Sequence, residues 1–126
     1  MTTVALDASA LMAPVELDLR LFEELDRLLG EVDILVPGAV RAELDRLAAG
    51  ASAEAAVARV GSDLAERGRT VDTNEQNGDD ALLALATAGE AEYVVTTDRP
   101  LRDRLLSAGV PVIETRGRTT LEITEP

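Results

Sequence analysis

Short runs of β-forming residues alternate with longer helical patterns along the whole chain. In the longer stretches apolar residues recur at helical spacing, and glycine or Pro37-Gly38 stands where an element is expected to end. The strands are expected at residues 3–6, 34–36, 70–71, 93–96, 110–113 and 121–123. The helices are expected within residues 17–29, 40–48, 52–64, 79–88 and 100–108. This alternation predicts an α/β fold with a central, mainly parallel β-sheet flanked by helices, in one domain spanning residues 1–126.

The residue types that are missing restrict the chemistry more than those that are present. The chain has no Cys, His or Trp, and all 12 of its basic residues are Arg. A His general base, a Cys nucleophile, a Schiff-base Lys, a His-ligated zinc and a P-loop lysine are therefore excluded. Catalysis is left to carboxylates, hydroxyls, Arg, a single Tyr and any metal ion that carboxylates can hold.

The hydropathy pattern gives no indication of a membrane segment. No apolar run approaches the ~20 residues that cross a bilayer, and the N-terminus carries Asp7 where a signal peptide would continue its apolar region. Since there is also no cysteine for a disulfide, we expect a cytoplasmic protein with no membrane partner.

Acidic residues outnumber basic ones by 24 to 12, which gives a formal net charge of -12. The acids are spread along the chain and do not form one tail. Hydrated carboxylates keep a protein soluble when salt screens its charge. The absence of Lys favours a halophilic protein over one with an ordinary acidic surface.

Four of the acids stand where helices follow expected strands. Asp7 directly follows the first strand, and Asp98 comes just after the strand at 93–96. Asp80 lies in the first turn of a helix, and Glu43 is one turn into the segment after the second strand. Ligands of open parallel sheets bind outside the carboxyl ends of the strands, so these acids are expected to converge. Their mutual repulsion would be relieved by Mg²⁺ or Mn²⁺.

Each acid also has a purely structural interpretation. Asp80 and Asp98 could cap helices, and Glu43 could be a solvated helix residue. Asp7 fits such an interpretation least well, because a carboxylate at the end of a buried strand needs a cation or hydrogen bonds to offset its desolvation. The four acids together favour a functional site.

Two N-terminal segments carry a family pattern. LDASAL at 6–11 contains Asp7 and Ser9, and VPGAVRAEL at 36–44 contains Glu43. These segments resemble the first two motifs of PIN-domain nucleases. The resemblance implies that Asp7 and Glu43 are catalytic, metal-binding acids and that the Ser9 hydroxyl supports them.

Two later segments resemble the remaining motifs of that family. In DDALLALA at 79–86, Asp80 is the better match than Asp79 because the apolar residues follow it directly. In VVTTDRPLRDRL at 94–105, Asp98 matches the fourth acid, with Thr96 or Thr97 as the supporting hydroxyl. The resemblance covers nearly the whole chain and implies Mg²⁺ or Mn²⁺ as cofactor.

Two further stretches narrow the subfamily. ALMAPVEL at 10–17 and AGVPVIETRGRTTLEI at 108–123 resemble archaeal PIN proteins related to the endonuclease of the eukaryotic small-subunit processome. That resemblance implies a metal-dependent endoribonuclease in rRNA processing. Two alternatives stay open. One is a VapC-type toxin of a toxin–antitoxin pair, a class that usually lacks the Arg-Gly-Arg tail, and the other is a non-catalytic RNA-binding PIN module.

The arginines near the fourth acid and in the tail are candidate RNA ligands. Arg99, Arg116 and Arg118 could meet phosphates, whereas Arg102 and Arg104 are expected in surface ion pairs. The resemblance further implies a second copy of the chain, an antitoxin or a ribosome-assembly factor as candidate protein partners.

Overall fold

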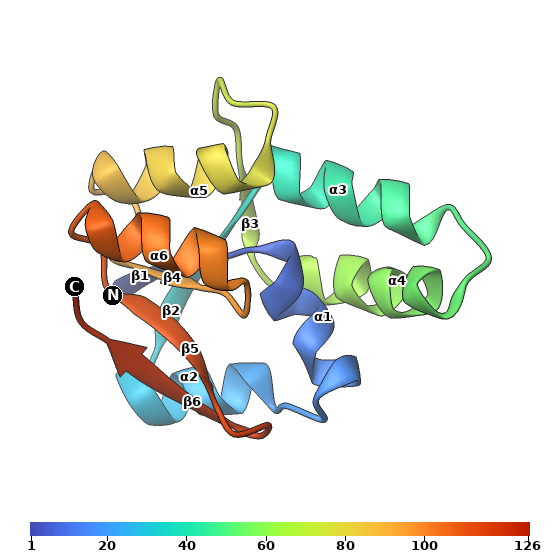
Figure 1. Cartoon of the computed structure of the whole chain (residues 1–126), viewed down its shortest axis with the longest axis horizontal. Helices are drawn as coiled ribbons and strands as arrows, with labels where there is room; N and C mark the ends of the chain where they lie inside the picture. Colours follow the sequence, from blue (N-terminus) through green and yellow to red (C-terminus); the bar gives the residue numbers. More distant parts are fainter.

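The computed structural model describes residues 1–126 and contains six strands and six helices (Figure 1). The strands are β1 Thr2–Leu6, β2 Val32–Pro37, β3 Arg69–Val71, β4 Tyr93–Val95, β5 Val112–Arg116 and β6 Thr120–Thr124. The helices are α1 Ala8–Glu16, α2 Leu21–Leu29, α3 Gly38–Ala48, α4 Ala53–Ala65, α5 Gly78–Thr87 and α6 Arg99–Ser107.

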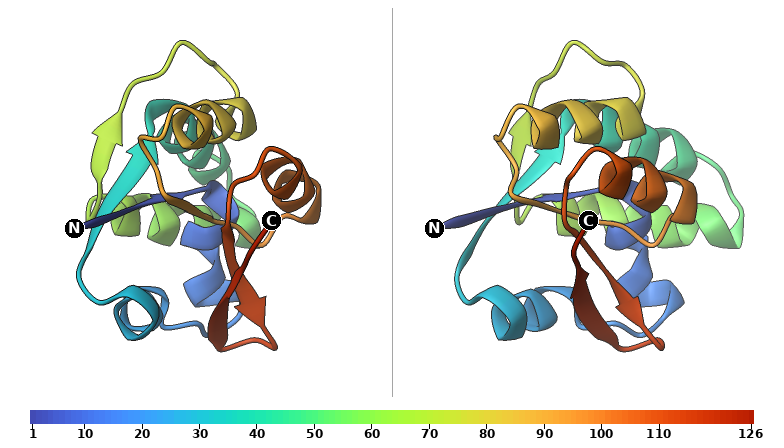
Figure 2. Two further views of the ribbon diagram at one scale, coloured as in Figure 1. Left: turned by 90° about the vertical axis from the view of Figure 1, so that its left-hand side faces the viewer. Right: turned by 60° about the vertical axis from the view of Figure 1, so that its left-hand side comes forward.

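All six strands form one sheet in the order β3-β2-β1-β4-β5-β6. Neighbouring strands from β3 across to β5 are parallel to one another. Only β6 is antiparallel to its neighbour, β5. Figure 2 shows β3 at one edge of the sheet and the β5–β6 hairpin at the other. The mainly parallel α/β fold expected from the sequence is therefore confirmed.

The helices cover both faces of the sheet and bury an aliphatic core. Helices α5 and α6 contact each other and the strands beneath them, while α1 contacts α2, α3 and α4. Val4, Ala5 and Leu6 of β1 are completely buried, as expected for a central parallel strand covered on both faces. None of the helices combines the length and apolarity that a membrane span requires.

Helix α1 was not expected from the sequence. Five of its nine residues are buried, so it lacks the apolar stripe that marks a surface helix, and Pro14 lies within it. The helix expected over 17–29 begins only at Leu21. Between the two helices Asp18 adopts a φ of 57°, which breaks the helical path.

The strand order places a switch point between β1 and β4. From β1 the chain builds outward through β2 and β3, and it then returns to the other side of β1 to form β4 and β5. Connections that leave neighbouring strands in opposite directions open a crevice at their carboxyl ends. Asp7 follows β1 directly, and Asp98 follows β4 after two residues.

Candidate active site

Asp7 is held at the end of β1 by three hydrogen bonds to its carboxylate. Its side chain is the N-cap of α1, where Oδ1 accepts the backbone N–H of Ala10 at 2.8 Å. The Ser9 hydroxyl donates to the same oxygen at 2.7 Å, and the Thr96 hydroxyl donates to Oδ2. With Asp7 only 5% exposed, these donors fix its carboxylate in a single orientation.

The segment after β4 is tied to the β1–α1 junction by the same hydroxyls. The Thr96 Oγ1 atom accepts the backbone N–H of Asp98 at 3.0 Å, and the Ser9 Oγ atom accepts the backbone N–H of Thr97 at 2.9 Å. Of the two threonines expected to support the acids, Thr96 is the one whose hydroxyl reaches Asp7. Thr97 contributes only its backbone N–H to this network.

Burial raises the pKa of Asp7 to about 6. The hydrogen bonds from Thr96, Ser9 and Ala10 lower this pKa, while the nearby charge of Asp79 raises it slightly. Desolvation therefore outweighs three favourable hydrogen bonds. At neutral pH Asp7 is an ionised carboxylate whose charge the protein alone stabilises poorly.

Asp7, Glu43, Asp79 and Asp98 line one small pocket of about 70 Å³. Asp7, Asp79 and Asp98 stand at the starts of α1, α5 and α6, and Glu43 lies in the middle of α3; these are the four helices that follow parallel strands. The pocket has room for a few water-sized groups and is far too small for a nucleotide. The N-termini of these helices carry partial positive charge, which favours anionic side chains there.

The third acid in the pocket is Asp79, whereas Asp80, the residue that the sequence favoured, lies outside it. Helix α5 begins at Gly78, and the Asn77 side chain caps it by accepting the backbone N–H groups of Asp79 at 2.8 Å and Asp80 at 3.3 Å. In this register Asp79 points into the pocket, and its pKa is raised by burial and then by Asp98.

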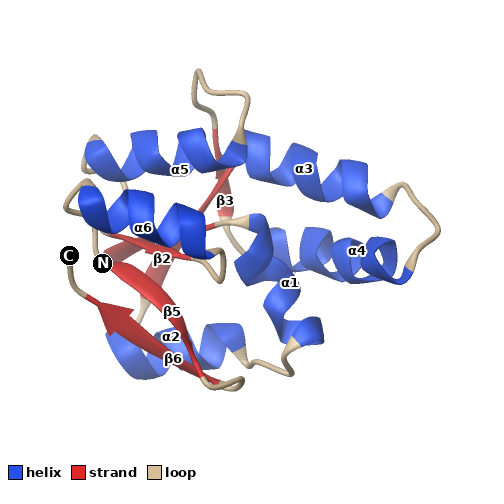
Figure 3. Ribbon diagram, in the orientation of Figure 1, coloured by secondary structure: helices blue, strands red, loops and turns tan.

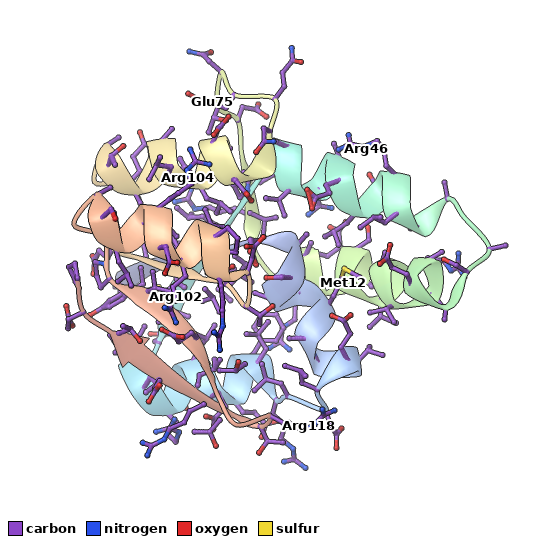
Figure 4. The ribbon with its side chains drawn as sticks, in the orientation of Figure 1. Met12, Arg46, Glu75, Arg102, Arg104 and Arg118 are labelled. Atoms are coloured by element: carbon purple, nitrogen blue, oxygen red, sulfur yellow. The ribbon has the colours of Figure 1, made fainter.

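Asp80 lies outside the pocket, on the side of α5 that faces α6. Its Oδ1 is 2.9 Å from Nη2 of Arg104, and its side chain is 51% exposed. Figure 4 shows Arg104 between the two helices. Asp80 thus forms a surface ion pair, which is also the role expected for Arg104.

Asp98 combines a structural role with its place in the pocket. It is the N-cap of α6, with Oδ1 accepting the backbone N–H of Leu101 at 3.3 Å. The capping interpretation therefore applies to Asp98 and also to Asp7. It does not apply to Asp80, because Asn77 occupies the capping position of α5.

The arginines proposed for RNA are dispersed. Arg99 is exposed, makes no ion pair and lines a wholly polar pocket of about 90 Å³ next to Asp98. Arg116 lies 3.8 Å from Glu122 on the β5–β6 hairpin. Arg118 donates to the backbone oxygen of Glu16 at the other end of α1 (Figure 4). Of these three arginines, only Arg99 lies beside the pocket acids.

Arg102, which was expected in a surface ion pair, forms one with Glu114.

The pocket suits a hard divalent cation by its donor chemistry. As the side chains lie, no three carboxylates form a ready coordination group. Mg²⁺, however, is typically held by one or two carboxylates and keeps several waters. The hydrogen bonds occupy two acceptor positions on Oδ1 of Asp7 and one on Oδ2, so one position on Oδ2 stays free for a cation.

The largest hollow of the molecule lies elsewhere. It measures about 600 Å³ and is formed by the C-terminal end of α1, the start of α2 and the end of α4. The Arg67 guanidinium stacks 3.9 Å from the centre of the Phe22 ring there. Its lining includes the two acids Glu23 and Asp26 together with the two arginines Arg20 and Arg67, whereas the four acids that converge line the much smaller pocket.

Comparison with known proteins agrees with this fold. A family model described as a PIN-like domain matches residues 4–118, a range that includes all four pocket acids. The chain belongs to the PIN-like domain family. The PIN-like domain also shares its fold with a solved structure described as "Structure of the PIN domain endonuclease Utp24", with a TM-score of 0.82 at 21% identity. That alignment covers 98% of this chain and 92% of the other, and no curated protein sequence matches.

Proposed function

We propose that this PIN-like domain is a divalent-metal-dependent endoribonuclease whose catalytic acids are Asp7, Glu43, Asp79 and Asp98. The observation that carries the proposal is the convergence of these four side chains on one pocket at the switch point of the sheet. Four carboxylates in so small a space repel one another, and a bound cation removes that cost.

The chemistry assigned to the site is hydrolysis of a phosphodiester bond. A bound Mg²⁺ or Mn²⁺ ion would lower the pKa of a water molecule and neutralise charge on the reacting phosphate. Asp7, Glu43, Asp79 and Asp98 would hold the ion. Ser9 and Thr96 keep the Asp7 carboxylate in place, so that little reorganisation is needed when the substrate arrives.

The size of the pocket restricts the substrate. A space of about 70 Å³ admits a phosphate group but no base, so the strand must present its backbone to the rim. Single-stranded or loop RNA does this most easily. The sequence resemblance to the processome endonuclease makes ribosomal RNA the substrate we propose. A net charge of -12 opposes RNA binding in dilute buffer, and concentrated salt or a partner would offset it.

The proposal is tested by comparing wild type, Asp7→Asn and Asp26→Asn on end-labelled structured RNA with Mn²⁺ or Mg²⁺. Asp26 is an exposed acid on α2, so its substitution controls for loss of charge. We expect wild type and Asp26→Asn to cleave the RNA at equal rates, and EDTA to stop the reaction. The cleavage rate of Asp7→Asn should be lower by about 100-fold or more.

Equal cleavage by wild type and Asp7→Asn, or no cleavage by either, would contradict the enzymatic proposal. Titration calorimetry with Mn²⁺ then separates a non-catalytic module, which binds RNA without metal, from a metal-binding enzyme. We expect wild type to bind the ion and Asp7→Asn to bind it weakly.

A further inference from the structure

The chain contains two asparagines and one glutamine, and all three stand in the segment NEQN at 74–77. Elsewhere its polar surface is made of acids, arginines, serines and threonines. The amide side chains are thus confined to the connection between β3 and α5. We call residues 72–77 the amide loop.

The amide loop stands out from the body of the molecule just before the start of α5. It projects beyond α3 and α5 in every view (Figures 1, 2 and 3). It leads straight into Gly78 and Asp79, both of which line the pocket. A strand with its phosphate in the pocket would therefore pass beside this loop.

Two of the three amides have no role in the fold. Asn77 caps α5, but the side chains of Asn74 and Gln76 are exposed and make no hydrogen bond within the chain. Each offers two N–H donors and one carbonyl acceptor. These groups are free for a ligand that presents both donors and acceptors.

A hollow of about 400 Å³ lies between the amide loop and the face of α5 that carries Asp80. Leu83 and Ala84 contribute its apolar surface, and Glu75, Asp80 and Thr87 complete its lining. Glu75 extends from the loop in this region (Figure 4). This hollow also carries two carboxylates, but unlike the pocket of about 70 Å³ it has room for a nucleobase.

We infer that the amide loop determines specificity, with Asn74 and Gln76 recognising the edge of an unpaired base next to the scissile phosphate. The inference rests on the proposed ribonuclease function and specifies its substrate. On a protein of net charge -12, neutral amides can contact RNA without adding charge repulsion. Adenine is the base whose donor and acceptor edge an amide matches with two hydrogen bonds.

The test compares wild type with the double variant Asn74→Ala/Gln76→Ala on single-stranded RNA 12-mers. The strands carry either adenine or uracil at the positions flanking one cleavage site. We expect wild type to prefer the adenine strand, and the double variant to lose that preference through a KM about 10-fold higher with kcat unchanged. Thr119→Ala, in the exposed β5–β6 turn, is the control and should behave as wild type.

Binding of the same fluorescent 12-mers to Asp7→Asn, with and without the two loop substitutions, gives a second readout that does not need cleavage. If the preference for adenine in binding disappears when the two loop amides are replaced, the inference is supported, even if no cleavage is seen. Absence of cleavage alone would count against the proposed ribonuclease function and not against the role of the loop. Active wild type with no base preference, or a preference that survives in the double variant, overturns the inference. Because both side chains are exposed, unfolding temperatures of the variants should stay unchanged.

Discussion

At the scale of single residues, Asp7 combines a buried charge with three hydrogen-bond donors. Its folded pKa of about 6 lies above the value of about 3.9 for an unfolded chain. The folded protein therefore binds this proton more tightly than the unfolded chain does. The resulting stabilisation is fully present below pH 4 and is lost as pH rises through 6. At neutral pH the metal-free protein is less stable because of this group.

Asp7→Asn should consequently stabilise the metal-free protein at pH 7.5. Two pKa units correspond to about 3 kcal/mol, which is the upper limit of the gain in unfolding free energy. Urea unfolding in EDTA measures it, and the difference from wild type should shrink towards pH 4. An Asp7→Asn protein that is less stable than wild type at pH 7.5 would contradict a desolvated Asp7 carboxylate.

Asp79 and Asp80 should differ sharply when each is changed to Asn. Asp79→Asn removes a pocket acid and should lower the cleavage rate about 10–100-fold. Asp80→Asn breaks only a half-exposed pair with Arg104 and should leave the rate within about twofold. Single-turnover rates with Mn²⁺ decide between them. The reverse order would restore Asp80 as the catalytic acid.

At the scale of elements, Thr96 joins the ends of β1, β4 and α6. Its hydroxyl donates to Asp7 and accepts from the Asp98 backbone. Thr96→Val should therefore cost about 1–3 kcal/mol of stability and lower kcat, because the Asp98 N–H loses its acceptor and Asp7 a donor. Thr97→Val is the matched control, since its side chain makes no hydrogen bond and its backbone N–H is retained.

Thermal unfolding and kcat of the two threonine variants measure this prediction. If Thr97→Val lost as much stability and kcat as Thr96→Val, the two hydroxyls would have equivalent roles. The sequence alone could not tell which of the two threonines supports Asp7. Val94 and Val95 are both buried, so the strand gives no inward–outward alternation that identifies the threonine facing Asp7.

Other elements show what local patterns can predict. Strands β1, β2 and β4 and the acids that follow β1 and β4 could be located because β-rich runs end at recognisable positions. The register of α5 could not, since one residue rotates a helix by about 100° and apolar neighbours fit both aspartates. The capping residue Asn77 was the available signal. Helix α1 offered no periodic pattern, because it is buried on most sides.

At the scale of the whole molecule, strand order decides whether the acids meet. Residues 7 and 98 are far apart in the sequence, and only the pairing of β1 with β4 brings their elements together. Strand order depends on how helices pack over the completed sheet, which no single segment specifies. The expected parallel sheet predicted that the acids converge, but neither it nor the family resemblance gave the strand order. The solved structure of the PIN domain endonuclease Utp24 has the same fold.

The charge of the whole molecule bears on the halophilic hypothesis. Eight of the 24 acidic residues are paired with arginine, and those pairs are mostly at the surface. The remaining carboxylates repel one another, and the range of this repulsion shortens as the salt concentration rises. The Debye length falls from about 10 Å at 0.1 M to about 3 Å at 1 M, so concentrated salt removes most of this repulsion.

We therefore expect the unfolding temperature to rise as KCl increases from 0.1 to 2 M. Asp63 and Glu90 are exposed and unpaired, so the variant Asp63→Asn/Glu90→Gln should unfold at a higher temperature than wild type in 0.1 M KCl and gain less from added salt. Differential scanning calorimetry across the salt series measures both effects. A wild-type unfolding temperature that falls steadily into the molar range would refute salt adaptation. If added salt raised the unfolding temperature of the variant as much as that of wild type, charge repulsion would contribute nothing to the salt dependence. The rise would then come from the general strengthening of apolar burial by salt.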